Sequence, residues 1–118
     1  MANDFKRICT PSIGTSLTTI YAVPAGPSSA ALESIVIGIT MANKTSSGVT
    51  ASIFIDNEDG TNDVYIVKDA SIPAGAALEV MSGNKLVLMN DGTNADNLEA
   101  TCSATSSLDV TVSVLEDV

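Results

Sequence analysis

Carboxylates are the residues of this chain whose types and spacing could do chemistry, and they gather in two turns. The two groups are Asp56, Glu58, Asp59 and Asp63 in the first turn, and Asp91 and Asp96 in the second. Hard cations such as calcium prefer several oxygen ligands from one flexible loop, which makes these turns candidate calcium sites. Neither turn fits the EF-hand pattern, because Gly60 at the invariant glycine would put Ile55, with no side-chain oxygen, at the first ligand position. We therefore expect solvated turns and assign no metal ligand.

Catalytic chemistry is restricted further by the absence of histidine. Without it, Ser-His and Cys-His catalysis is excluded, and so are most zinc sites, since two cysteines cannot supply four ligands. Paired carboxylates hydrolyse glycosides only when one is held in a desolvated pocket, whereas every acidic cluster here falls in a turn, where water is abundant. The sequence predicts no enzyme, no catalytic residue and no cofactor.

The two cysteines, Cys9 and Cys102, are far apart in the sequence. No apolar signal segment surrounds Lys6 and Arg7, so we expect a chain made in a reducing cytosol. Cys102 alternates with polar residues, which favours a buried thiol over a disulfide or a nucleophile. For Cys9 the thiol and the disulfide both stay open.

Net charge and hydropathy exclude two classes of partner. Five basic against fourteen acidic residues give a net charge of −9, which repels phosphate backbones and anionic lipids. The longest aliphatic run, residues 35–39, is too short to cross a bilayer. We expect neither nucleic acid nor a membrane as partner.

Two segments with a period of two residues, 98–104 and 108–114, organise the elements that would position any site. In each, apolar residues alternate with polar ones, which predicts half-buried strands whose register is well specified, because a slip of one residue would bury the polar set. Six further strands are predicted at residues 17–23, 31–41, 49–56, 64–68, 76–81 and 86–89. Eight short strands joined by turns predict an all-β fold, a two-sheet antiparallel β-sandwich of jelly-roll or Greek-key type.

Finer details of the strands follow from particular residues. Residues 31–41 are apolar on both faces, which predicts a central strand covered on both sides, with Gly38 at a bulge or close approach. The turn at Asp59-Gly60 predicts one hairpin, and that at Gly83-Asn84 a second between residues 76–81 and 86–89.

The N-terminal segment, residues 1–16, has no clear period and is predicted to be a short arm, followed by the sandwich domain at residues 17–118. The arm has a positive net charge in an otherwise acidic chain, which suggests contact with something acidic; a frayed terminus is the alternative. Exposed apolar residues beside cations predict a subunit-contact site, made of Phe5, Lys6, Arg7 and Ile8.

Several short motifs carry a resemblance to a known family. They are Gly14-Thr15-Ser16, Ile20-Tyr21-Ala22-Val23-Pro24, Asn43, Val67-Lys68-Asp69-Ala70, Ile72-Pro73-Ala74-Gly75, Lys85-Leu86-Val87-Leu88, and Ser107 to Glu116. Together they resemble small virion structural proteins of tailed bacteriophages, especially cyanophages. The resemblance covers most of the chain from Gly14 onward and consists of turn and strand patterns instead of catalytic signatures.

The resemblance implies a non-enzymatic β-sandwich module, made in the host cytoplasm and displayed in many copies on a virion. Its partners would be the major capsid protein or other virion subunits, with a homotrimer as the expected oligomer. One placement is a capsid decoration or cement protein that stabilises the head shell; the alternative is a tail-, neck- or fibre-associated module. A carbohydrate-binding adsorption module is a third possibility, which the scarcity of aromatic residues disfavours.

Overall fold

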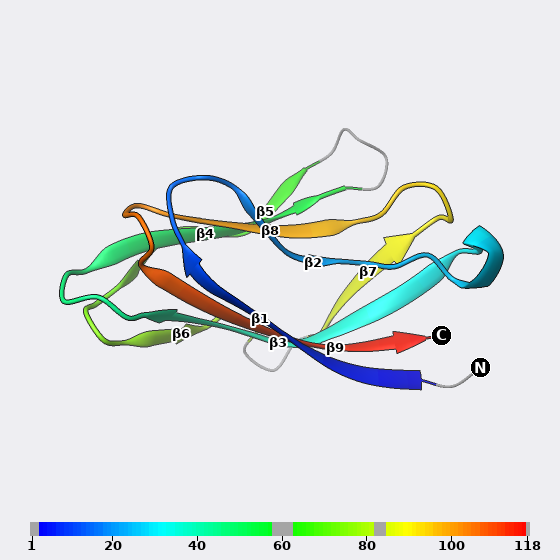
Figure 1. The fold of residues 1–118 in the computed structure, drawn as a ribbon, viewed down its shortest axis with the longest axis horizontal. Coiled ribbons are helices and arrows are strands. Elements are labelled where there is room, and N and C mark those ends of the chain that lie inside the picture. The colour runs from blue at the N-terminus through cyan, green and yellow to red at the C-terminus, as the bar shows by residue number, and fades with distance from the viewer. Residues whose placement is uncertain (1–2, 58–62, 82–84, 118) are drawn as a thin grey trace.

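The computed structural model describes residues 3–57, 63–81 and 85–117, which form nine strands in two antiparallel sheets (Figure 1). The elements are β1 Asn3–Ile13, β2 Thr18–Ala22, the short 3-10 turn η1 Pro27–Ser29, β3 Leu32–Asn43, β4 Val49–Asp56, β5 Val64–Ile72, β6 Ala77–Glu79, β7 Leu86–Asn90, β8 Asn97–Cys102 and β9 Leu108–Asp117. Within these described residues, no helix has the length and apolar character needed to span a membrane.

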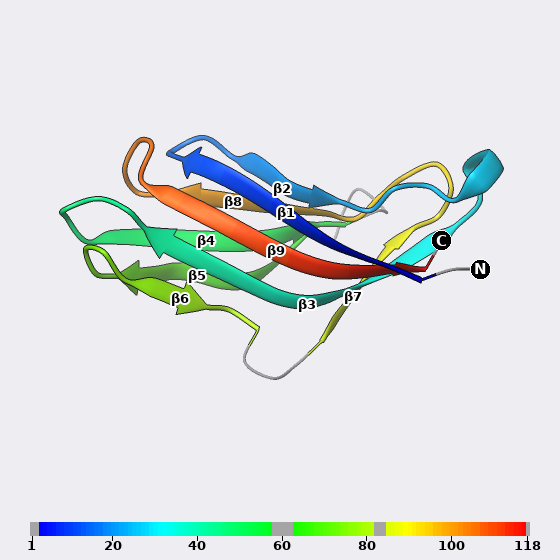
Figure 2. The same ribbon diagram turned by 60° about the horizontal axis from the view of Figure 1, so that its bottom comes forward.

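The strand pairing is nested along the chain. Sheet A has the order β1-β9-β3-β6, with β7 also paired to β3, and sheet B has the order β2-β8-β4-β5. The first strand thus pairs with the last and β2 with β8, while β4 pairs with β5 at the centre of the nest (Figure 2). This is the pattern of a jelly roll, so the predicted all-β jelly-roll sandwich is confirmed.

The core lies between the sheets and is built from the inward residues of the alternating strands. Sheet A contributes Val110, Val112 and Val114 from β9, and sheet B contributes Leu98, Ala100 and Cys102 from β8. The predicted half-buried strands at residues 98–104 and 108–114, and the buried thiol of Cys102, are therefore confirmed. Both cysteines are free thiols, with Cys9 exposed and Cys102 buried.

Strand β3 is central in sheet A, as its apolar sequence predicts. A register shift between Val36 and Gly38 confirms the bulge predicted at the glycine. Only one face of β3 is covered, however: Val36 is fully buried, whereas Ile37 is exposed on the outer face. The prediction that this strand is covered on both sides is wrong for the isolated chain.

The expectation of an N-terminal arm without strand structure is also wrong. Asn3–Ile13 forms β1, an edge strand that pairs along its length with β9. The sequence conceals this strand because its inward residues, Lys6, Ile8 and Thr10, are no more apolar than its outward ones. Pairing with β9 supplies the backbone hydrogen bonds that a periodic apolar face would otherwise have signalled.

The predicted hairpin between β6 and β7 does not form. Both strands pair antiparallel with β3, β6 at Thr40–Ala42 and β7 at Leu32–Val36, so they run in the same direction. Twelve-residue β3 is long enough to hold two short partners end to end, and neither has to reverse direction. The β4–β5 hairpin does form. The turns predicted at Asp59-Gly60 and Gly83-Asn84 lie outside the described residues.

Candidate subunit-contact site

The four predicted contact residues lie on β1 and are divided between its two faces. Phe5 stands opposite Leu115 and Arg7 opposite Ser113, on the outer face of sheet A. Lys6 and Ile8 stand opposite the buried residues Val114 and Val112, so they face the interior. The predicted site is therefore two sites, an outward pair and an inward pair.

Lys6 of the inward pair forms an ion pair within sheet A, and its partner Glu116 also bonds to sheet B. The Lys6 Nζ lies 2.9 Å from Oε1 of Glu116, whose side chain is 2% exposed. Tyr21 on β2 donates its hydroxyl proton to Glu116 Oε2 over 2.6 Å. Because that proton is used, Ser34 must donate to the Tyr21 oxygen, 2.8 Å away. The network ties three strands of sheet A to one strand of sheet B.

The electrostatics of this network fix the protonation states of Tyr21 and Lys6. Burial and the hydrogen bond to Glu116 raise the pKa of the Tyr21 hydroxyl well above its usual value. The hydrogen bond and the charge of Glu116 likewise raise the pKa of Lys6. Tyr21 therefore stays neutral and Lys6 stays charged, as a buried carboxylate requires of its neighbours.

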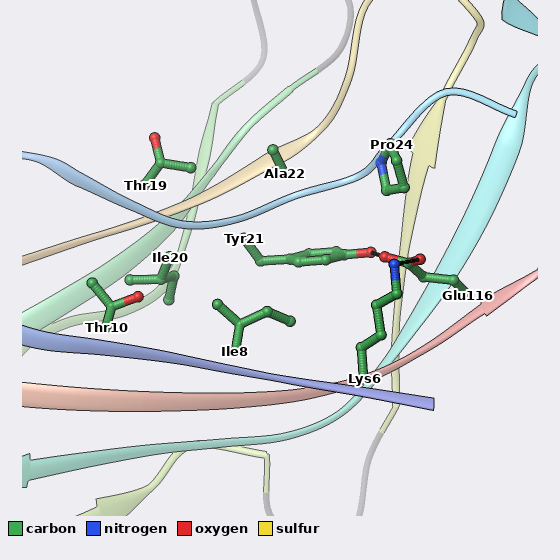
Figure 3. A pocket seen from close by; sticks show the side chains of 9 residues that line it. All are labelled: Lys6, Ile8, Thr10, Thr19, Ile20, Tyr21, Ala22, Pro24 and Glu116. Atoms are coloured by element: carbon green, nitrogen blue, oxygen red, sulfur yellow. Dashed lines mark hydrogen bonds and ion pairs between the residues drawn. The ribbon is translucent and has the colours of Figure 1, made fainter. Parts of the chain in front are cut away.

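Three residues of this network, Lys6, Tyr21 and Glu116, line a groove of about 390 Å³ between β1 and β2 (Figure 3). Its lining is Lys6, Ile8, Thr10, Thr19, Ile20, Tyr21, Ala22, Pro24 and Glu116. The ionisable groups that line the groove, Lys6, Tyr21 and Glu116, bind one another.

Phe5 of the outward pair belongs to a row of apolar side chains that crosses all of sheet A. In register, Phe5 of β1 lies opposite Leu115 of β9, which lies opposite Ile35 of β3, which lies opposite Val87 of β7. Phe5 is 73% exposed and Val87 56% exposed, and the exposed Ile37 adjoins the row. We call these four residues, Phe5, Leu115, Ile35 and Val87, the apolar row.

Charges flank the apolar row asymmetrically. On one side of the row lies Arg7, two residues after Phe5 on β1. Lys85, two residues before Val87, lies on the same side. On the other side, β3 carries Glu33 opposite Met89 of β7. The outer face of sheet A thus has an apolar centre with two cations on one side, the basic flank, and Glu33 on the other side, the acidic flank. Beyond the cations, Glu79 of β6 lies opposite Thr40 and accepts a hydrogen bond from its hydroxyl.

The carboxylate turns have structural partners wherever they are described. Asp91 accepts hydrogen bonds from the backbone N–H groups of Thr93 and Asn94, which lower the pKa of its carboxyl group. Asp63 accepts from the N–H of Asn57. Glu58 and Asp59 lie outside the described residues, and the described part of the chain contains no group of three potential metal ligands.

Glu116 and the row partners of Phe5 are the residues that the sequence analysis missed. The alternation of Val110, Val112 and Val114 continues to Glu116, so a carboxylate at an inward position was a signal that a cation must lie opposite. For the row, the signal was the apolar run around Ile35, whose two faces could not both be covered by one chain.

No protein-family model matches this sequence, and no curated protein sequence does. Among solved structures, the chain is similar to a Bacillus endospore appendage subunit described as belonging to a family of disulfide-linked pili, at 11% identity and a TM-score of 0.44, covering 97% of this chain and 86% of that one.

It is also similar to infectious bursal disease virus of the Gx strain, at 12% identity and a TM-score of 0.48, and to the VP2 subviral particle of that virus, at 15% identity and 0.45. These matches cover 98% and 97% of this chain, which spans 37% of the length of each viral chain. Values this low carry no argument about function.

Proposed function

We propose that this chain is a non-enzymatic structural protein of a tailed-bacteriophage virion, a decoration or cement protein that stabilises the head shell. The observation that carries the proposal is the apolar row, an exposed surface that crosses a whole sheet of an otherwise well-packed domain. Large exposed apolar patches on soluble domains mark contacts with other chains. The sequence resemblance to phage structural proteins supplies the class of assembly, and the jelly roll is a fold that capsid domains use.

The contact residues of this proposal are those on β1. Phe5 and Arg7 lie on the outer face of sheet A, where a neighbouring subunit can reach them. Lys6 and Ile8 hold β1 on the sandwich and so present that surface. The partners would be the major capsid protein or other virion subunits, further copies of this chain among them.

A carbohydrate-binding module is less well supported by the aromatic residues. Phe54 and Tyr65 do lie side by side on sheet B, with ring centroids 5.7 Å apart, but the rings are tilted by 53°. The Lys68 ammonium group also lies 5.2 Å from the centroid of the Tyr65 ring. Tilted rings, one of them covered by a cation, form no flat platform on which a sugar could stack.

Counting and locating the chain in purified virions tests the proposed function. Quantitative mass spectrometry should find hundreds of copies per particle, and cryo-EM should place them on the head. A few to some tens of copies below the head would support the tail, neck or fibre alternative. Absence of the chain from the particles would overturn both placements.

A further inference from the structure

The sequence of β3 indicates that something covers the outer face of sheet A. Strands covered on both faces have continuous apolar sequences, and β3 has such a run at residues 35–39. Within the chain, however, only the inner residues Val36 and Ile39 are buried completely. Of the outward residues in this run, Ile37 is exposed and Ile35 is only partly buried, although their composition is that of a covered face.

We propose that the cover is the same face of a second copy, related by a two-fold axis that runs along the apolar row. This rests on the proposed structural role, since it assigns a partner to the surface that carries that role. An axis in this position lays each apolar row against itself, and the two sheets stack face to face as they do in a sandwich. Such an isologous contact closes after two copies.

Charge complementarity supports this axis. A two-fold rotation about the row turns the basic flank of one copy over the acidic flank of the other. Lys85 of one copy would then lie over β7 of the second copy. Glu33 lies on the neighbouring strand of that copy, about 4.8 Å away, and the same pair would occur twice. Neither of these side chains has an ion-pair partner among the described residues of its own chain.

The size of the face fits a stable dimer. Strands β1, β9 and β3 have 10 to 12 residues, and β6 and β7 add three and five residues beside β3. With strands about 4.8 Å apart and a rise of about 3.4 Å per residue, the face has a flat area of about 650 Å². Side chains corrugate this surface and increase its accessible area. Stable complexes bury about 800 Å² on each partner, so the area of this face is of the order that a stable dimer requires.

The first experiment compares two exposed valines by analytical ultracentrifugation of the purified chain. Val87→Asp breaks the apolar row, whereas Val64→Asp is the matched control on β5 of sheet B, where the valine is 51% exposed. We expect a wild-type dimer, a dissociation constant raised at least tenfold by Val87→Asp, and no change from Val64→Asp. Circular dichroism should show both variants folded. A monomeric wild type, a trimer, or equal weakening by both variants would overturn the proposal.

The second experiment tests the axis with charge reversals. Lys85→Glu alone places acidic groups against Glu33, and Glu33→Lys alone places basic groups against Lys85, so each variant should dimerise at least tenfold more weakly. Mixing the two variants pairs opposite charges at both positions and should restore dimers that contain one chain of each kind. If the mixture stays as weak as its components, the two-fold arrangement is wrong.

These outcomes are separable from those of the proposed function. A chain that is monomeric in solution but present in hundreds of copies per virion would overturn the dimer alone. A dimer that is absent from virions would overturn the virion role and leave the dimer standing.

Discussion

The two outer faces of the sandwich treat their apolar residues differently. On sheet B, Phe54 and Tyr65 contact each other and Lys68 lies over Tyr65, so the outward aromatic residues have partners within the chain. On sheet A, the residues of the apolar row lie opposite one another, but Phe5 and Val87 at its two ends remain exposed. The same alternation thus produces one face that is complete in the monomer and one that a second chain must complete, which distinguishes a passive surface from a contact surface.

The largest expected effect comes from placing a carboxylate on the inner face of sheet A instead of on its outer face. Val112→Asp puts a carboxylate into the core, at a cost of several kcal/mol against a total stability of about 5 to 15 kcal/mol. Circular dichroism and urea denaturation should show an unfolded chain. Thr111→Asp, one residue away and facing outward, is the control and should stay folded. A folded Val112→Asp protein would mean that the faces have been assigned in reverse.

The next effect concerns the bond between the sheets. Tyr21→Phe removes the hydroxyl that donates to Glu116, leaves the buried carboxylate one hydrogen bond short, and should lower the free energy of unfolding by about 1–3 kcal/mol. Urea denaturation measures the loss. Thr19→Ser, on the same strand but exposed, should lose far less. A Tyr21→Phe chain as stable as wild type would show that the network adds nothing to the seam.

Because of the same network, the free energy of unfolding depends on pH in the alkaline range. The pKa of Tyr21 is raised in the folded chain, whereas in the unfolded chain it lies near about 10. Above about pH 10 the unfolded chain releases this proton and the folded chain keeps it, so the free energy of unfolding falls as the pH rises. Lys6, whose pKa is also raised, acts in the same direction. The decline should be smaller in Tyr21→Phe, and an unchanged slope would contradict the assignment.

The sequence predicts a strand of this protein well where the two faces of the strand differ in polarity, and poorly where they do not. Strands such as β8 and β9, whose two faces differ in polarity, were predictable, because only one register buries the apolar set. Strand β1 was not, since its pairing with β9 rests on backbone hydrogen bonds and on a lysine that faces inward. The partnership of Lys6 with Glu116 joins residues at opposite ends of the chain, and no local pattern specifies such a contact.

A smaller effect sharpens the comparison of the outer faces directly. Tyr65→Thr removes a ring that packs on Phe54 and should cost the monomer about 0.5–1.5 kcal/mol. Val87→Thr, in the apolar row, should cost the monomer less, because Val87 is 56% exposed and its one cross-strand partner is Ile35. Thermal denaturation at concentrations low enough to keep both chains monomeric compares them. A larger loss from Val87→Thr would reverse the comparison.

The smallest effect lies at the polar end of sheet A. Lys44 pairs with Asp109 at 2.9 Å, but both side chains are well exposed, so Lys44→Ala should cost less than about 1 kcal/mol. The N–H of Ser12, and then Lys44, lower the pKa of Asp109. The pair's contribution is therefore present above about pH 4 and lost as the pH falls, so denaturation curves of wild type and variant should converge in acid. A gap that widened in acid would contradict this.

Hydroxyl-radical footprinting of the chain in virions and as a dilute monomer tests most directly whether sheet A is the contact surface. Phe5 and Met89 report on the outer face of sheet A, and Tyr65 reports on that of sheet B; all three are exposed and carry reactive side chains. Assembly should protect Phe5 and Met89 from oxidation and leave Tyr65 as reactive as in the monomer. Protection of Tyr65 with Phe5 and Met89 unchanged would show that the contact surface lies on the other face.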